Sequence, residues 1–257
     1  MAEKTEHNNI SLDRAFQIIE YLSSSNVPQT VTEISQALNF NRATTNNLLG
    51  TMLRHNYVIK DGHGKYSISS KLFEIGYAYH NHNPLVHAFV QQNFFETHHY
   101  NCALGLAIPV HPMKAILLCV QNNMDNFEDI PMVGCSLPAY ASGAGKLLLA
   151  YASPEQRDAF FARTPMLPLT PNPITDRSVL EQEIELAKVQ GYARDTGEVR
   201  PHLCCVTAPV FGTRRELTAM VSITGHKDFV LPNEQKLIQD VVSCGKLITF
   251  RIGGIAP

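Results

Sequence analysis

The sequence predicts an α+β protein in which a small N-terminal domain of three helices and a β-hairpin precedes a larger C-terminal domain of mixed helices and strands. Three observations support this prediction. Apolar residues recur at helical spacing in three short segments before residue 55. Two alternating segments then flank a turn that contains glycine. From residue 84 onward, helical segments and strands rich in Val, Ile and Leu follow one another without a strict β-α-β order.

The first two helices are defined by their capping residues. Ser11 is the expected N-cap of the first helix, which ends before the polar run 23–28. Thr30 caps the second helix, and Glu33 three residues later completes a capping box. A tight turn at 39–41 follows, because Asn tolerates left-handed backbone.

The third helix, expected over residues 42–55, has one apolar and one polar face. The expected inner face contains Ala43, Leu48, Leu49, Met52 and Leu53. The expected outer face contains Thr44, Thr45, Asn46, Asn47, Thr51 and Arg54. A helix that enters the major groove needs such short donors and acceptors, since Asn pairs bidentately with adenine and Thr reaches phosphate or a thymine methyl. A polar face alone is more often simply solvated, but the order helix–helix–turn–helix–hairpin favours DNA binding.

The hairpin, with strands at 57–60 and 65–68, completes a predicted winged helix-turn-helix. The balance of charge between residues 41 and 71 is +4, although residues 1–80 balance to zero and the whole chain carries −2. Because this excess is modest, tight binding is expected to need more than one such domain at each operator. The predicted contacts to double-stranded DNA are Arg42, Thr44, Thr45, Asn46, Asn47, Arg54, His63 and Lys65. For His63, an exposed turn residue without any DNA contact is an equal alternative.

The remaining segments define three parts of the chain. We expect the winged helix-turn-helix over 10–69, a linker helix over 70–83 and an α+β domain over 84–252. Helices are predicted at 83–98, 154–162, 176–190 and 232–250, with a further apolar helix opened by 142–146. Strands are predicted at 102–110, 114–120, 130–136, near 192, 203–211 and 217–224.

Small and polar residues of this second domain suggest a site for a small carboxylate. Gly143 and Ala144 at a helix start leave N–H groups for an anion. Asp195 ends a short strand, and Cys205 begins an apolar one. The remaining candidates are two hydroxyls that share one face of their strand, Ser222 and Thr224. Each residue also has a structural alternative: close packing for Gly143, an inert core thiol for Cys205, and backbone hydrogen bonds for the hydroxyls.

Motifs along the chain strengthen both predictions. In the first domain they are Ser11–Glu20, Val31–Ser35, Leu48-Leu49 and Lys65–Gly76. In the second they are Leu137–Leu149, Gly191–Asp195 and Cys205–Pro209. In this order they resemble IclR-type transcription regulators from about residue 10 to residue 250.

The resemblance implies a GAF/profilin-like effector-binding domain, in which relatives bind small organic acids at the positions of the six candidate residues. It also implies a homodimer or a dimer of dimers, and repression of a catabolic pathway as the expected mode of action. Two departures stand out. Asn46-Asn47 replaces a pair that commonly includes arginine, so the operator sequence cannot be carried over. Thr224 stands where serine is frequent.

Several other classes of protein are disfavoured. The six cysteines form no C-x-x-C pair, which indicates reduced thiols and a cytoplasmic location, with no signal peptide and no membrane-spanning run. The segment 142–146 lacks the P-loop pattern, because residue 140 is Tyr and residue 147 is Leu. Cys205 lacks an orienting acid and base, so we expect no enzyme, and no cofactor or metal.

Two alternatives stay open at this point. A metal- or redox-responsive regulator would use the cysteines or the histidines His80, His82, His87, His98 and His99. A protein-interaction module would predict that no small molecule affects what the protein binds.

Overall fold

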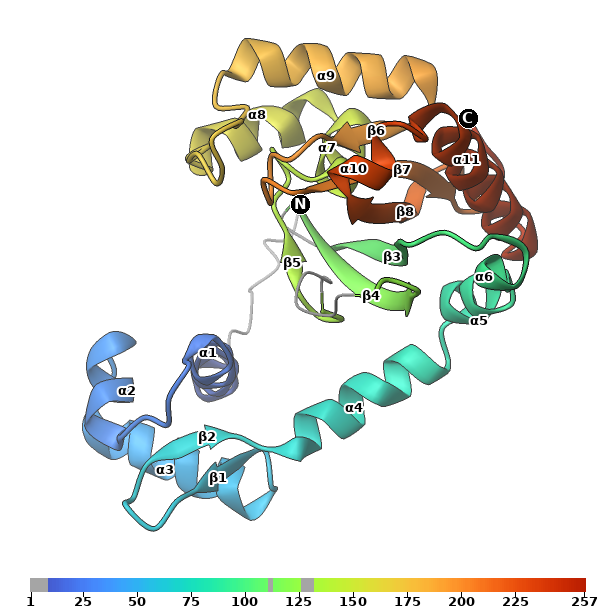
Figure 1. Ribbon diagram of the computed structural model, residues 1–257. Helices are drawn as coiled ribbons and strands as arrows, with labels where there is room; N and C mark the ends of the chain where they lie inside the picture. Colours follow the sequence, from blue (N-terminus) through green and yellow to red (C-terminus); the bar gives the residue numbers. More distant parts are fainter. Residues whose placement is uncertain (1–8, 111–112, 126–131) are drawn as a thin grey trace, which may run out of the picture. The chain divides into compact units, whose positions relative to one another are not determined.

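A computed structural model describes residues 9–110, 113–125 and 132–257 (Figure 1). The chain divides after Asn81 into two compact units, each with a core of its own.

The N-terminal unit has the predicted order of elements. It contains α1 (Ile10–Ser24), α2 (Val31–Ala37), α3 (Arg42–Arg54), β1 (Val58–Lys60), β2 (Tyr66–Ile68) and α4 (Ser70–Asn81). The capping box of Thr30 and Glu33 is present, and Asn39 adopts the left-handed conformation with φ 53°. The predicted N-cap of α1 is wrong by two residues. Asn9 caps the helix instead, and its side chain accepts the N–H of Leu12 at 3.2 Å.

A small apolar core holds this unit together. It is formed by Ile18, Leu22, Ile34, Leu49, Met52, Val58 and Tyr66. Strands β1 and β2 pair antiparallel, and Gln29 joins them through a bridge to Tyr66, with N–H to carbonyl distances of 2.8 and 2.7 Å. This bridge attaches the hairpin to the segment that directly precedes α2.

The C-terminal unit is built around a six-stranded antiparallel sheet. Its strands are β3 (Ala103–Val110), β4 (Lys114–Asn122), β5 (Ser136–Leu137), β6 (Ala193–Asp195), β7 (Leu203–Phe211) and β8 (Leu217–His226). Their spatial order is β5-β4-β3-β8-β7-β6. The predicted α+β class is therefore confirmed, because the sheet is antiparallel and strands and helices do not alternate one by one along the chain.

Helices cover both faces of this sheet (Figure 1). The core of one face includes α5 (Pro84–Val90), α6 (Phe94–Thr97) and the long helix α11 (Glu234–Arg251). The opposite face packs against α7 (Gly143–Ala150) and α9 (Arg177–Gln190), with α8 (Pro154–Arg163) beside them. A short helix, α10 (Lys227–Val230), precedes α11. Because α7 is buried along its whole length, its first turn lies against the sheet.

The prediction of one helix over 83–98 is wrong. The segment forms α5 and α6, separated at Asn93, whose φ of 49° is left-handed and cannot continue a helix. The strand predicted over 130–136 falls partly outside the described residues, and the described part contains a turn at 133–134 and the start of β5. Among the helices of the described residues, none combines the length and apolar character that crossing a membrane requires.

Candidate functional site

The outer face of α3 carries most of the predicted DNA-contacting residues. Arg42, Asn46, Asn47 and Arg54 are exposed, and Thr44 is half-buried. These side chains project from a helix whose inner side is fixed to the core by Leu49 and Met52. The face therefore offers amide and guanidinium groups to a partner, as a recognition helix requires.

The prediction that Thr45 belongs to this outer face is wrong. Thr45 is 0% exposed, and its hydroxyl donates to the carbonyl of Asn41 at 3.1 Å. It shares the buried stripe with Leu49 and Met52 at positions i, i+4 and i+7. Ala43, expected inside, is exposed instead. A side chain with no exposed surface cannot contact a base in this conformation.

Thr45→Val is accordingly expected to change operator affinity by less than about twofold, because the isosteric side chain stays inside. Loss of the buried hydroxyl is expected to change stability by about 1 kcal/mol. A gel shift and a urea unfolding curve measure the two quantities separately. A large loss of operator affinity in a folded variant would show that Thr45 contacts the operator after all.

The turn between β1 and β2 places the two predicted wing residues. His63 is exposed and Lys65 is half-buried. The carboxylate of Asp61 accepts their N–H groups at 2.9 and 2.8 Å, and the bond from Lys65 holds the pKa of Asp61 below its ordinary value. Lys60, which the sequence did not single out, lies with its ammonium 5.3 Å from the centre of the Tyr66 ring.

In the C-terminal unit, one cavity of about 70 Å³ is lined by all six predicted effector residues: Gly143, Ala144, Asp195, Cys205, Ser222 and Thr224. They come from the start of α7, the end of β6, and strands β7 and β8. A single buried water needs roughly 10–15 Å³, so the cavity has room for several waters or a small organic molecule. Residues 143 and 224 are far apart in sequence, and the sheet brings them together.

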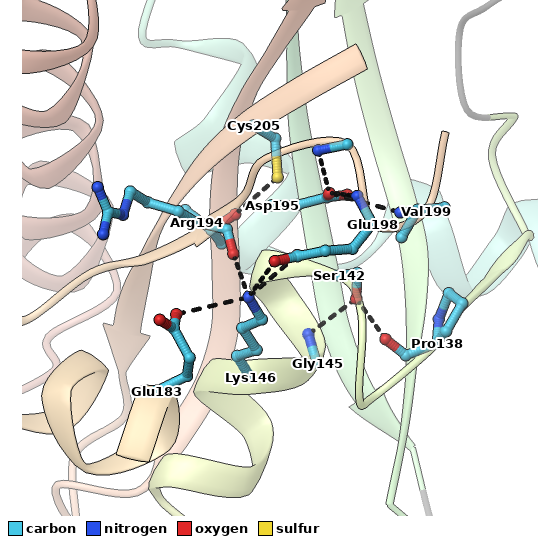
Figure 2. Close-up of polar contacts among 12 residues, drawn as sticks. Pro138, Ser142, Gly145, Lys146, Glu183, Arg194, Asp195, Glu198, Val199 and Cys205 are labelled. Carbon is cyan, nitrogen blue, oxygen red and sulfur yellow. Dashed lines mark hydrogen bonds and ion pairs between the residues drawn. The ribbon is translucent and has the colours of Figure 1, made fainter. Parts of the chain in front are cut away.

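The start of α7 is held by a cap at Ser142 and by close packing at Gly143. Ser142 caps the helix: its hydroxyl accepts the N–H of Gly145 at 3.0 Å and donates to the carbonyl of Pro138 at 2.8 Å (Figure 2). A Cβ at Gly143 would lie 2.5 Å from the hydroxyl of Thr207 and 3.2 Å from the sulfur of Cys205. The packing role that the sequence allowed for Gly143 is therefore present, and it coexists with a place at the cavity.

Asp195 is a buried carboxylate that orders the loop behind it. Its Oδ1 accepts the N–H groups of Gly197, Glu198 and Val199 at 3.0, 2.8 and 3.5 Å (Figure 2). Burial raises the pKa of Asp195, while the Glu198 N–H and the charge of Lys146 act in the opposite direction. This wall of the cavity consequently offers a strong hydrogen-bond acceptor.

Cys205 is a protonated thiol at neutral pH. Burial raises its pKa to about 12, and the neighbouring charge of Asp195 adds to the effect. Since the thiolate is the form that reacts with oxidants and metals, this environment disfavours the redox alternative at this residue. In the part of the chain that the structure describes, no three His, Cys, Asp or Glu side chains form a group that could hold a metal ion.

Sequence reasoning missed several residues of the cavity. Ser142, Arg200 and Thr207 supply further polar groups. Apolar walls come from Ala103, Leu117, Val120, Leu137, Val199 and Leu203. Strand alternation could have found Thr207, because it lies two residues after Cys205 and faces the same side. Nothing in the local sequence marks Arg200, which lies in the loop between β6 and β7.

Comparison with known proteins agrees with both units. Residues 11–62 match the family described as the IclR helix-turn-helix domain, and residues 114–249 match the bacterial transcriptional regulator IclR C-terminal domain. The HTH-type transcriptional repressor AllR of Salmonella paratyphi A is 28% identical over 220 residues, which cover 84% of this chain and 79% of the repressor.

Two solved structures share the fold. An IclR-type regulator from Silicibacter sp. TM1040 has a TM-score of 0.82 at 19% identity, and the match covers 96% of this chain and 98% of that one. An IclR homologue from Microbacterium hydrocarbonoxydans, solved in complex with 4-hydroxybenzoate, has a TM-score of 0.77 at 18% identity over 94% and 98% of the two chains.

The matched families and the matched repressor are transcription regulators rather than enzymes. A helix-turn-helix unit with an exposed polar face on α3 is joined here to a unit with a cavity of about 70 Å³. The chain belongs to the IclR family of bacterial transcription regulators, which bind DNA and respond to a ligand.

Proposed function

We propose that this protein is a repressor of a catabolic pathway and that a small organic acid, bound in the cavity of the C-terminal unit, controls its hold on the operator. One observation carries the proposal. Polar groups from α7, β6, β7 and β8 converge on a single cavity whose walls are otherwise apolar. Such a cavity suits a ligand with a small apolar body and few polar ends.

The carboxylate of the effector belongs at the start of α7. Helix N-termini attract anions through their N–H groups and the helix dipole, and Gly143 and Ala144 stand at that position. Ser222 and Thr224 on β8 supply hydroxyl donors beside it. The thiol of Cys205 is uncharged and so does not repel the anion.

Asp195 accepts a hydrogen bond from a different part of the effector. A second carboxylate would be repelled there, so a hydrogen-bond donor such as a hydroxyl is the preferred partner. The loop N–H groups all reach Oδ1, and Oδ2 is the oxygen we assign to the effector. The ligand in the Microbacterium homologue, 4-hydroxybenzoate, carries both a carboxylate and a hydroxyl, which makes it a rational first probe.

The working assembly is a homodimer or a dimer of dimers on a near-palindromic operator, because two-fold proteins read two-fold sites. The parts are the DNA-binding domain at 10–69, the linker helix at 70–83 and the effector domain at 84–252. None of the twelve residues of α4 is buried, and Phe73 is 75% exposed. These exposed apolar side chains of α4 are explained if a second copy of the chain covers them.

A thermal-shift screen of small carboxylates, followed by gel shifts on upstream DNA with and without each hit, tests the proposed function. A hit is expected to raise the melting temperature of the C-terminal unit and to lower operator affinity. Differential affinity for the two states is what shifts the equilibrium. A hit that stabilises the protein without any effect on DNA binding would contradict control by this cavity.

Ser222→Ala is expected to weaken binding of the effector about tenfold, because one hydrogen bond to a charged group is worth about 1.5 kcal/mol. Operator binding without effector is expected to stay unchanged. Isothermal titration measures the first quantity and a gel shift the second. Ser243→Ala, at an exposed position of α11, is the matched control and should alter neither.

A further inference from the structure

Lys146 is a buried charged residue of the otherwise apolar helix α7. All eight residues of α7 are buried, and Lys146 is 1% exposed. Its ammonium lies 3.0 Å from both carboxylate oxygens of Glu198 and 2.9 Å from the carbonyl of Arg194. Glu183 of α9, which is one-third exposed, lies 3.6 Å away (Figure 2). A fully enclosed ammonium with three anionic or polar partners is a specific arrangement rather than a surface contact.

The partners of Lys146 lie directly behind the wall of the effector cavity. Arg194 precedes Asp195 and Glu198 follows it by three residues, and the N–H of Glu198 donates to that carboxylate at 2.8 Å. Asp195 and Val199 line the cavity, whereas Lys146 and Glu198 are not among its lining residues. Lys146 therefore contacts the rear of the loop whose front faces the effector.

A second contact holds the same loop. Thr170 is buried, and its hydroxyl donates to the carbonyl of Gly197 at 2.8 Å. The loop 195–199 is thus fixed at three places: by its own N–H groups on Asp195, by Thr170, and by Lys146 through Glu198. Of these three contacts, the one with Lys146 is an ion pair.

Packing alone does not require this ion pair. Apolar side chains of similar volume can replace a buried pair without loss of stability, because desolvation offsets much of the attraction. The cluster is also short of positive charge, since Lys146 faces Glu198, Glu183 and Asp195. Burial raises the pKa of Glu198 to about 7 against the opposing charge of Lys146, and the charges of Asp195 and Glu183 add to the increase. What the pair adds is directional geometry, because one ammonium holds the carbonyl of Arg194 in β6 and the carboxylate of Glu198 in the loop that follows.

We propose that Lys146 is a positioning residue of the effector site, which acts through Glu198 to fix loop 195–199 so that Asp195 and Val199 face the effector. The inference rests on the proposed role of this cavity. It assigns a function to a lysine that does not touch the ligand, and it extends the site to the interior of α7.

The double variant Lys146→Met/Glu198→Met tests the proposal, because it replaces the ion pair by two unbranched apolar side chains and leaves the net charge of the protein unchanged. In the full-length protein, hydrogen exchange at the amides of residues 197–199 is expected to accelerate at least tenfold. The dissociation constant for 4-hydroxybenzoate is expected to rise about tenfold, with global unfolding little changed. Glu181→Gln is the control, because it breaks an ion pair with Arg177 on the exposed side of α9 and should affect neither measurement.

Wild-type exchange at residues 197–199 in the folded double variant would overturn the proposal. If that variant does not fold, Glu198→Leu replaces it, since it removes the carboxylate that Lys146 holds but keeps the backbone N–H that donates to Asp195; unchanged loop exchange there would have the same meaning. If the unaltered protein binds no carboxylate in the screen, the proposed effector class fails, while the exchange experiment still decides whether Lys146 positions the loop.

Discussion

Gly145→Ala is expected to lower the free energy of unfolding of the C-terminal unit by about 3 kcal/mol, as overpacking against immobile atoms does. A Cβ at this position would collide with the Cα of Ala139 and lie 2.6 Å from the carbonyl oxygen of Pro138. Both neighbours are backbone, so no rotamer change relieves the contact. The helix is buried on all sides and cannot move away without disturbing the sheet.

Urea unfolding monitored by far-UV circular dichroism measures this loss. Gly76→Ala, at a helical position of the other unit, is the comparison variant, because no atom of the same chain lies within 4 Å of a Cβ there. There the substitution is expected to stabilise by about 0.5–1 kcal/mol through helix propensity. Equal stability of Gly145→Ala and the unaltered protein would show that α7 does not pack on the 138–139 segment as described.

The contrast between these glycines illustrates how much of the fold the sequence could predict. Local signals were sufficient where a residue acts on its immediate neighbours, as with the Thr30–Glu33 capping box and the left-handed Asn39. They failed at Asn93, because helical periodicity on both sides conceals a single left-handed residue. The close approach of α7 to residues 138–139 is a tertiary fact, and Gly145 carries no separate mark in the sequence.

Thr45 shows a different limit. Its hydroxyl suggested an outer position, but the phase of the helix, set by Leu49 and Met52, places it inside. A hydroxyl that bonds the carbonyl four residues earlier is compatible with burial. Polarity alone therefore misplaced one residue of the recognition helix, while the exposed amides of Asn46 and Asn47 lie where expected.

The candidate effector site was predictable mainly because its residues form recognisable motifs. Gly143, Asp195 and Cys205 each belong to one of them, and the sheet then brings them to one cavity. The ion pair behind the cavity was not predictable, since Lys146 and Glu198 are separated by 52 positions. A lysine in an apolar helix signals that a partner exists, but its identity depends on the fold.

Asn47→Ala is expected to weaken operator binding most among single substitutions on α3. A bidentate amide contact to adenine is worth about 1–3 kcal/mol, and a palindromic site loses it twice, so the expected loss is about 2–6 kcal/mol. Gel shifts at a fixed salt concentration measure it. Effector binding is expected to stay unchanged, because Asn47 belongs to the other compact unit.

The salt dependence of binding separates base reading from phosphate binding. Removal of a neutral amide should leave the slope of log K against log salt unchanged, whereas Arg54→Ala should make it shallower by about one for each phosphate that is no longer neutralised.

Thr45→Val serves as the control for the buried face of α3. Wild-type affinity of Asn47→Ala on a bound operator would contradict base reading by this residue. A slope that changes with the amide would instead show that its contribution is electrostatic. The Asn46-Asn47 pair provides no positive charge of its own. A loss of affinity with an unchanged salt slope is therefore the result expected of a helix that contacts bases through its amides.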